Sequence, residues 1–95
     1  MNINPATLVQ VTAGRDKDKY LAVTGVIDKN YVLVCDGRRR RVENPKKKKL
    51  KHIKSLDYSL DRIRDKLEEG SNINNSELRR EIRRALLELG ILKEE

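Results

Sequence analysis

The stretch from Tyr20 to Gly37 reads YLAVTGVIDKNYVLVCDG, two apolar runs rich in β-branched residues, each followed by turn-forming residues. β-Branched and aromatic side chains favour extended backbone, so residues 20–28 and 31–35 predict two strands. A polar DKN turn separates them, and Asp36-Gly37 is the strongest hairpin signal in the chain. Gly25 interrupts the first run and predicts a bulge or a sharp bend, as in small barrels.

The flanking sequence extends this β pattern in both directions. Residues 7–13 contain LVQVT, which alternates in part and predicts a strand that ends at the polar turn GRDKDK. After the Asp36-Gly37 turn, residues 38–43 predict a short fourth strand that Asn44-Pro45 breaks, and residues 50–56 predict a fifth. Five short strands joined by tight turns predict a small antiparallel barrel over residues 1–56, because closure hides exposed strand edges.

The apolar period becomes helical after this segment. Leu56, Leu60, Ile63 and Leu67 are spaced i, i+4, i+7 and i+11, which predicts a helix that Asp57 or Ser59 caps and Gly70 ends. A second helix is predicted after the loop SNINN, with Asn75 or Ser76 as its cap and Gly90 at its end. Its apolar face contains Leu78, Ile82, Ala85, Leu86 and Leu89. The predicted fold is therefore mainly β with an α tail, in which residues 57–95 form a helical extension that packs on the barrel.

Composition limits the class of protein. Ninety-five residues make one domain, or one small domain plus an appendage, and with 37% hydrophobic residues and no Phe or Trp the core must be thin. One cysteine and one histidine exclude an intramolecular disulfide and a zinc site built from Cys and His. Cys35 lies in the apolar run YVLVC and is predicted to be a small buried side chain. The chain has no apolar stretch near the ~18 residues of a membrane span and begins without a signal-peptide pattern. We expect a cytoplasmic protein.

Positive charge is concentrated in one segment, Arg38 to Lys54, which we call the basic tract. It reads RRRRVENPKKKKLKHIK, ten of its seventeen residues are Lys or Arg, and Glu43 alone opposes them. Its net charge of +9 exceeds the +7 of the whole chain, so the remaining residues sum to −2. A local block of like charge repels itself unless a polyanion or water lies beside it. A membrane surface fits poorly because the cations do not follow an amphipathic helix.

The two halves of the basic tract suit different contacts. Guanidinium groups of Arg38 to Arg41, on a strand, would offer planar forks of donors to phosphates. Lys46 to Lys49 follow Pro45 and are predicted to start in an extended loop, where ammonium groups act as mobile point charges. The alternatives are an arginine edge that only prevents aggregation and a lysine loop that is merely solvated.

Other candidates lie outside these two tetrads. Arg15 and Lys17 either flank the tract or pair with Asp16 and Asp18 in the same turn. His52 is either a polar residue at the surface or at the edge of the core, or a contact to a base or phosphate. A stripe on the second helix either extends the basic surface or is solvated and offset by glutamates; it comprises Arg79, Arg80, Arg83 and Arg84. The predicted RNA-contact set is Arg15, Lys17, Arg38, Arg39, Arg40, Arg41, Lys46, Lys47, Lys48, Lys49, Lys51 and His52.

Several of these motifs carry a family resemblance. GRDKDKY at residues 14–20, DGR at 36–38, VENPKKK at 42–48 and Lys51-His52 occur in one order. On the basis of these motifs, the stretch from Leu8 to Ile53 resembles the KOW-domain family of RNA-binding and ribosome-associated proteins. The likeness is greatest to small bacterial members, which are akin to archaeal and eukaryotic large-subunit ribosomal KOW proteins. The chain departs from the pattern at Asp18, where many relatives have Gly, and near Lys49, where they tend to have Asn. The resemblance implies an SH3-like barrel whose loops and basic strands contact RNA.

Catalysis has little support in the sequence. Neither a nucleophile–base set nor a P-loop or dinucleotide fingerprint is present, and we expect no metal, cofactor or small-molecule substrate. Three scattered tyrosines do not make a stacking platform, and Tyr20 and Tyr31 are predicted to pack in the core. The leading hypothesis is a non-enzymatic protein that binds ribosomal or other structured RNA. The alternatives are a module that docks a ribosomal or transcription protein, and a general DNA-binding protein.

Overall fold

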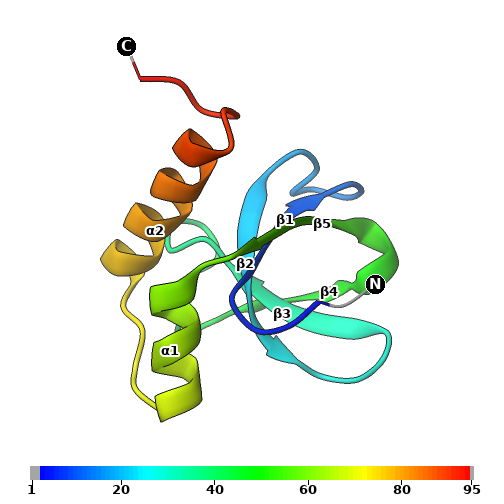
Figure 1. The fold of residues 1–95 in the computed structure, drawn as a ribbon. Helices are drawn as coiled ribbons and strands as arrows, with labels where there is room; N and C mark the ends of the chain where they lie inside the picture. The colour runs from blue at the N-terminus through cyan, green and yellow to red at the C-terminus, as the bar shows by residue number, and fades with distance from the viewer. Residues whose placement is uncertain (1–2, 95) are drawn as a thin grey trace.

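The computed structural model describes residues 3–94 as a five-stranded sheet followed by two helices (Figure 1). The elements are β1 (Thr7–Val11), β2 (Tyr20–Val26), β3 (Tyr31–Cys35), β4 (Lys46–Lys49), a 3₁₀ turn (Leu50–His52), β5 (Ile53–Ser59), α1 (Asp61–Glu69) and α2 (Asn75–Glu88). The mainly-β fold with an α tail is confirmed at this level.

Within residues 3–94 the strand order is β4-β3-β2-β1-β5, and every neighbouring pair is antiparallel. β4 and β5 stand at the two edges, so the sheet is open and the predicted closed barrel is not confirmed. The predicted bulge is confirmed, because the register between β2 and β3 shifts between Val23 and Gly25. The Asp28 carboxylate makes the turn before β3, where it accepts the N–H groups of Asn30 and Tyr31 at 2.8 and 2.9 Å.

The prediction of a strand at Arg38–Glu43 is wrong. Residues 36–45 form an irregular segment that we call the basic loop. The Asp36 carboxylate accepts the backbone N–H groups of Arg38 and Arg40 at 2.8 and 3.0 Å, and Gly37 has a φ of +80°. These side-chain bonds occupy donors that a sheet ladder would use, so the chain turns here instead of extending.

The fourth strand lies where a lysine loop was predicted. β4 is Lys46–Lys49, and it pairs with β3 in the register Val34↔Lys46 to Tyr31↔Lys49. Lysine is a weak strand former, but an edge strand can keep charged side chains in water, and lysine there discourages pairing with another chain. The predicted fifth strand also begins later, at Ile53, because residues 50–52 form the 3₁₀ turn.

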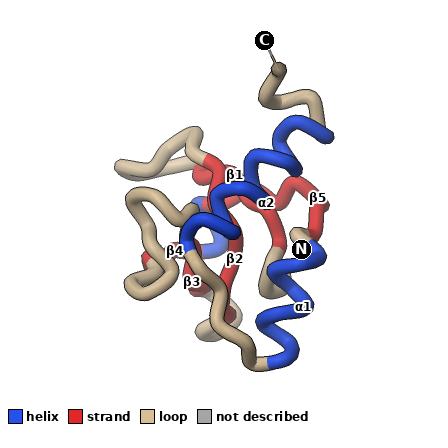
Figure 2. The backbone as a smooth tube through the Cα atoms, turned by 90° about the vertical axis from the view of Figure 1, so that its left-hand side faces the viewer, coloured by secondary structure: helices blue, strands red, loops and turns tan. Residues whose placement is uncertain are grey.

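The core has two parts, one on each face of the sheet. Alternation along the strands places one set of side chains on each face. One cluster comes from the strands, with Ile3 and Leu50 packed beside it; its buried members are Val9, Val11, Leu21, Val23, Val32, Val34 and Ile53. The sheet curls (Figure 1), and this cluster includes no helix residue. The other face packs against α1 and α2 through Leu8, Ala22, Cys35, Leu60, Ile63, Leu78, Ile82 and Ala85. Figure 2 shows both helices along that face.

The start of the first helix was predicted too early. Leu56 belongs to β5, and α1 begins at Asp61 after Leu60, without a side-chain cap from Asp57 or Ser59. The predicted ends are confirmed: Gly70 and Gly90 both have a φ of +74°, the left-handed conformation that favours glycine. α2 begins one residue earlier than predicted, because Asn74 is the cap: its side-chain oxygen accepts the N–H of Glu77 at 2.7 Å.

Candidate nucleic-acid interface

Asp16 brings three basic segments together. It lies in the loop between β1 and β2, residues 12–19, which we call the first loop, and its side chain is only 3% exposed. Its Oδ2 accepts hydrogen bonds from Nε and Nη2 of Arg40 at 3.1 and 3.0 Å, and Nζ of Lys48 lies 3.5 Å away. The first loop, the basic loop and β4 therefore meet at one carboxylate.

The environment of Asp16 keeps it ionised. Burial raises the pKa of its carboxyl group, but the hydrogen bond and charge of Arg40 and the charge of Lys48 lower it by more, so the pKa lies below its usual 3.8. Arg40 and Lys48, with side chains 29% and 11% exposed, are thereby engaged within the fold. Both belong to the predicted contact set, and the structure gives them a structural role that the sequence did not suggest.

The other members of the predicted contact set lie in the first loop, the basic loop, β4 and the 3₁₀ turn. Most are exposed: Arg15, Lys17, Arg38, Arg39, Arg41, Lys46, Lys47, Lys49 and Lys51. His52 is half-buried in the turn before β5. The first loop thus holds Arg15 and Lys17 on either side of the buried Asp16, rather than folding them back on the acids of the same turn. Apart from Lys51, which lies in the 3₁₀ turn, the exposed cations belong to the first loop, the basic loop and β4, which are joined through Asp16.

Alternation on β4 divides its lysines between two faces. Lys48 is paired with Val32, whose side chain is in the core, and so reaches the inner side where Asp16 lies. Lys47 and Lys49 project from the outer side. There the ammonium group of Lys47 lies 4.4 Å from the centre of the Tyr31 ring, a cation–π contact. Tyr31 is thus half-buried beneath a lysine rather than buried in the core.

The far side of the basic loop is attached to the start of α2. The Asn75 side chain accepts the N–H of Val42 at 2.9 Å and donates to Glu43 at 2.7 Å, while Nε of Arg41 lies 3.1 Å from the same carboxylate. The hydrogen bond from Asn75, with smaller contributions from a backbone N–H and from Arg41, lowers the pKa of Glu43 to about 2. The one acid of the basic tract therefore anchors the loop.

Gly37 fits closely against the same helix. A Cβ atom at this position would lie 2.5 Å from the carbonyl oxygen of Asn75. Nη1 of Arg79 donates to the carbonyl oxygen of Gly37 at 2.6 Å, and its Nη2 donates to Ser76 at 3.1 Å. The basic loop is thus held from both sides, by Asp16 and by α2.

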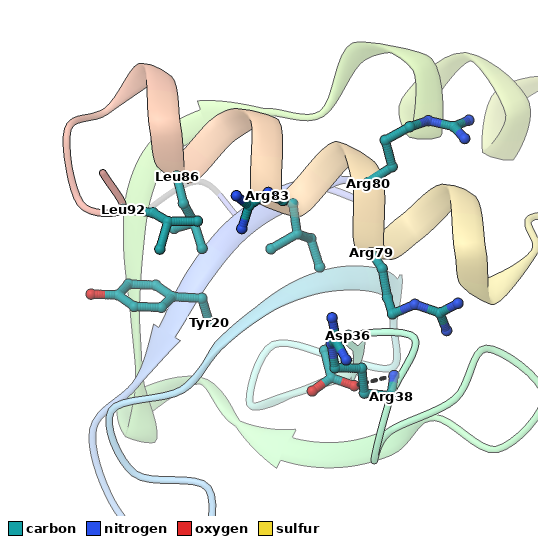
Figure 3. Close-up of a pocket in the computed structure, with 9 residues that line it drawn as sticks. Tyr20, Asp36, Arg38, Arg79, Arg80, Arg83, Leu86 and Leu92 are labelled. Carbon is teal, nitrogen blue, oxygen red and sulfur yellow. Dashed lines mark hydrogen bonds between the residues drawn. The ribbon is translucent and has the colours of Figure 1, made fainter. Parts of the chain in front are cut away.

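A pocket of about 420 Å³ lies between the basic loop and α2 (Figure 3). Its lining residues are Tyr20, Asp36, Arg38, Arg79, Arg80, Ile82, Arg83, Leu86 and Leu92. Three arginines of the helical stripe therefore face the same space as Arg38, although the sequence left open whether that stripe joined the basic surface. The i, i+4 spacing of Arg79 and Arg83 indicated a shared helix face, but the loop that meets them is about forty residues away in sequence.

Asp16 and Asn75 are the important residues that sequence reasoning missed. Asp16 lies in a turn of alternating charges, and its pairing with cations of the same turn was one of the two alternatives. Asn75 was predicted only as a helix cap. Residues 3–94 contain no cluster of three or more His, Cys, Asp or Glu side chains that could hold a metal ion. Nor does any helix in that range have the length and apolar character needed to cross a membrane.

Comparison with protein-family models and with curated proteins adds no relative. No protein-family model matches the chain, and no curated protein matches it either. The resemblance to KOW domains therefore depends on the motifs GRDKDKY, DGR, VENPKKK and Lys51-His52.

Proposed function

We propose that this chain is a non-enzymatic, ribosome-associated RNA-binding protein that binds ribosomal or other structured RNA through the first loop, the basic loop and β4. One observation carries the proposal: exposed cations lie on the first loop, the basic loop and β4, and the buried Asp16 joins these segments through Arg40 and Lys48. Fixed cations that need a polyanion beside them suit a phosphate backbone. The family resemblance supports the same function, and with it the proposal that the curled sheet is an open form of an SH3-like barrel.

The chemistry favours structured RNA over an unstructured single strand. Sequence-tolerant binding of single strands uses rows of aromatic side chains on which bases stack. Here Tyr31 lies beneath Lys47, and Tyr58 donates a hydrogen bond to Glu88 on the helical side. Arg38 and Arg39 would contact phosphates from the basic loop, and Lys46, Lys47 and Lys49 would extend the contact along β4.

Fluorescence anisotropy with a ribosomal RNA hairpin, repeated across salt concentrations, tests the proposal. If about six phosphates are neutralised, the slope of log affinity against log salt is expected between about −4 and −5.5. The double variant Arg38→Gln/Arg39→Gln should make that slope shallower by between about 1.4 and 1.8. The matched control, Arg62→Gln/Arg64→Gln, removes the same charge from α1 and should leave the slope unchanged.

A flat salt profile, or equal losses in both double variants, would refute binding through the basic surface, which comprises the exposed cations of the first loop, the basic loop and β4. Competition at fixed salt between the RNA hairpin and duplex DNA of equal length separates RNA binding from general DNA binding, because phosphates alone do not distinguish them. Co-sedimentation of the full chain with ribosomes, lost in the Arg38→Gln/Arg39→Gln variant, tests the ribosomal part of the proposal.

A further inference from the structure

The pocket between the basic loop and α2 has two chemically different ends. Arg38 and Arg79 lie at one end, whereas Leu86 and Leu92 lie together beside the Tyr20 ring at the other, with Arg83 next to them (Figure 3). Four arginines and one aspartate line the pocket, for a net charge of +3. A volume of about 420 Å³ is within the range of sites that hold small organic molecules. Such a site suits a ligand with an anionic group and a flat apolar body.

The apolar end is built by the C-terminal cap of α2. Gly90 turns the chain with a φ of +74°, and the N–H groups of Ile91 and Leu92 both donate to the carbonyl oxygen of Leu86, at 3.0 and 3.1 Å. This Schellman-type ending folds the tail back over the last turn. It brings Leu92 to the end of the pocket where Tyr20, the first residue of β2, lies (Figure 3).

The cations of the pocket are not equally free to bind a ligand. Arg79 already donates to Gly37 and Ser76, and Nε of Arg80 lies 4.0 Å from the Glu81 carboxylate. Arg38 and Arg83 are exposed and come from opposite walls. A phosphate between them would receive donors from both the basic loop and α2.

We propose that this pocket binds one unpaired nucleotide, with its phosphate on Arg38 and Arg83 and its base against Tyr20, Leu86 and Leu92. The proposal rests on the proposed function, since it identifies the element of RNA that the protein selects: a bulged or looped-out nucleotide next to a helix. A base held in a duplex cannot enter, because both of its faces are stacked. The site adds selectivity for RNA shape to the phosphate contacts made by the basic surface.

The first experiment uses single nucleotides and does not depend on RNA binding. Titration of the ¹⁵N-labelled full chain with 5′-AMP should shift the amide signals of Tyr20, Arg38, Arg83 and Leu92. Adenosine and inorganic phosphate, which each supply one half of the ligand, should bind about tenfold or more weakly than AMP. AMP binding that is no tighter than phosphate binding, or signals that shift elsewhere, would overturn the proposal.

The second experiment compares an RNA hairpin that has a one-nucleotide bulge with the same hairpin fully paired. The bulged RNA should bind about tenfold more tightly, as expected for one stacked base. Arg83→Gln and Leu92→Ser should each remove most of this preference while leaving affinity for the paired hairpin within about twofold of Arg62→Gln, the control on α1. A preference that survives both variants would overturn the proposal.

The two experiments separate the two proposals. If the chain binds neither RNA but AMP shifts the pocket signals, the proposed function fails and the nucleotide site stands. If both hairpins bind equally in a salt-dependent way and AMP shifts nothing, the proposed function stands and the nucleotide site fails.

Discussion

Oδ2 of Asp16 accepts two hydrogen bonds from the guanidinium group of Arg40, at 3.0 and 3.1 Å, across 24 residues of sequence. A buried anion thus lies within a surface dominated by cations. Repulsion among those cations disfavours their close approach, and an ionised carboxylate among them offsets part of it. The arrangement of the basic surface and the stability of the fold are therefore expected to depend on the same residue.

Replacing Asp16 with asparagine should destabilise the protein. The change keeps the size of the side chain but leaves Arg40 and Lys48 close together without their shared anion, so the free energy of unfolding should fall by about 1.5–3 kcal/mol. Urea unfolding at pH 7 measures this. Asp18→Asn is the matched control, because Asp18 is in the same loop, is exposed and has a φ of +72° that asparagine tolerates. Its effect should stay within about 0.5 kcal/mol, and equal losses in the two variants would contradict the prediction.

The contribution of Asp16 should disappear in acid. Although burial acts in the other direction, Arg40 and Lys48 hold the folded-state pKa of Asp16 below the unfolded value of 3.8. The folded state therefore binds the proton less readily, so the stabilisation is present above pH 3.8 and is lost as the pH falls through the folded value. The stability difference between wild type and Asp16→Asn should be constant from pH 7 to about 5 and shrink below about 4. A difference that widens in acid would contradict this.

Gly37→Ala should separate the basic loop from α2. The new Cβ would meet the Asn75 carbonyl oxygen at 2.5 Å, in addition to the cost of alanine at a φ of +80°. Gly70→Ala is the control, since Gly70 has a similar φ of +74° and nothing within 4 Å of the added atom. Gly70→Ala should cost about 1–2 kcal/mol and Gly37→Ala at least about 1 kcal/mol more, measured by urea unfolding. Equal losses of stability in the two variants would show that the basic loop moves away from Asn75 at no cost.

Local patterns predicted the elements that local physics determines. The first three strands, the Gly25 bulge and the glycine helix ends follow from side-chain branching and permitted φ values, and all of them are found. The predicted strand at Arg38–Glu43 is absent. It was predicted because Asp36-Gly37 is typical of a two-residue hairpin turn that leads directly into a strand. In the structure Asp36 bonds the loop's N–H groups and Gly37 packs on Asn75, a partner that spacing alone cannot identify.

In the candidate site, too, some features could be predicted from the sequence and others could not. Composition located the cations of the basic tract, and most of them are exposed. The contacts that arrange them join residues 24 to 42 positions apart: Asp16 with Arg40, Asn75 with Glu43, and Gly37 with Arg79. Such pairings depend on how the sheet and helices come together, so a single sequence with many possible cation–anion pairs could not distinguish them.

The Glu43 carboxyl group reports on the contact between the basic loop and α2. Its pKa of about 2 is set first by the hydrogen bond from Asn75, then by a backbone N–H and Arg41. Asn75→Ala removes the first of these, so the pKa of Glu43 should rise toward 4.5, measured by NMR titration of the side-chain carboxyl carbon. Arg41→Lys keeps the positive charge and removes only the weaker hydrogen bond from Nε, so it should raise the pKa less. A larger rise in Arg41→Lys than in Asn75→Ala would reverse this assignment.

Two neighbouring arginines of the basic loop should respond differently to the same substitution. Arg39 is exposed, whereas Arg40 donates two hydrogen bonds to Asp16. Arg39→Gln should weaken RNA binding several-fold through the lost phosphate contact and change the free energy of unfolding by less than about 0.5 kcal/mol. Arg40→Gln should lower the free energy of unfolding by about 1.5–3 kcal/mol, because it leaves the buried Asp16 carboxylate short of donors. Fluorescence anisotropy measures the RNA affinity of each variant, and urea unfolding measures its free energy of unfolding. If Arg40→Gln weakens RNA binding as much as Arg39→Gln while leaving stability unchanged, then Arg40 is a contact residue and its pairing with Asp16 does not hold the loop in place.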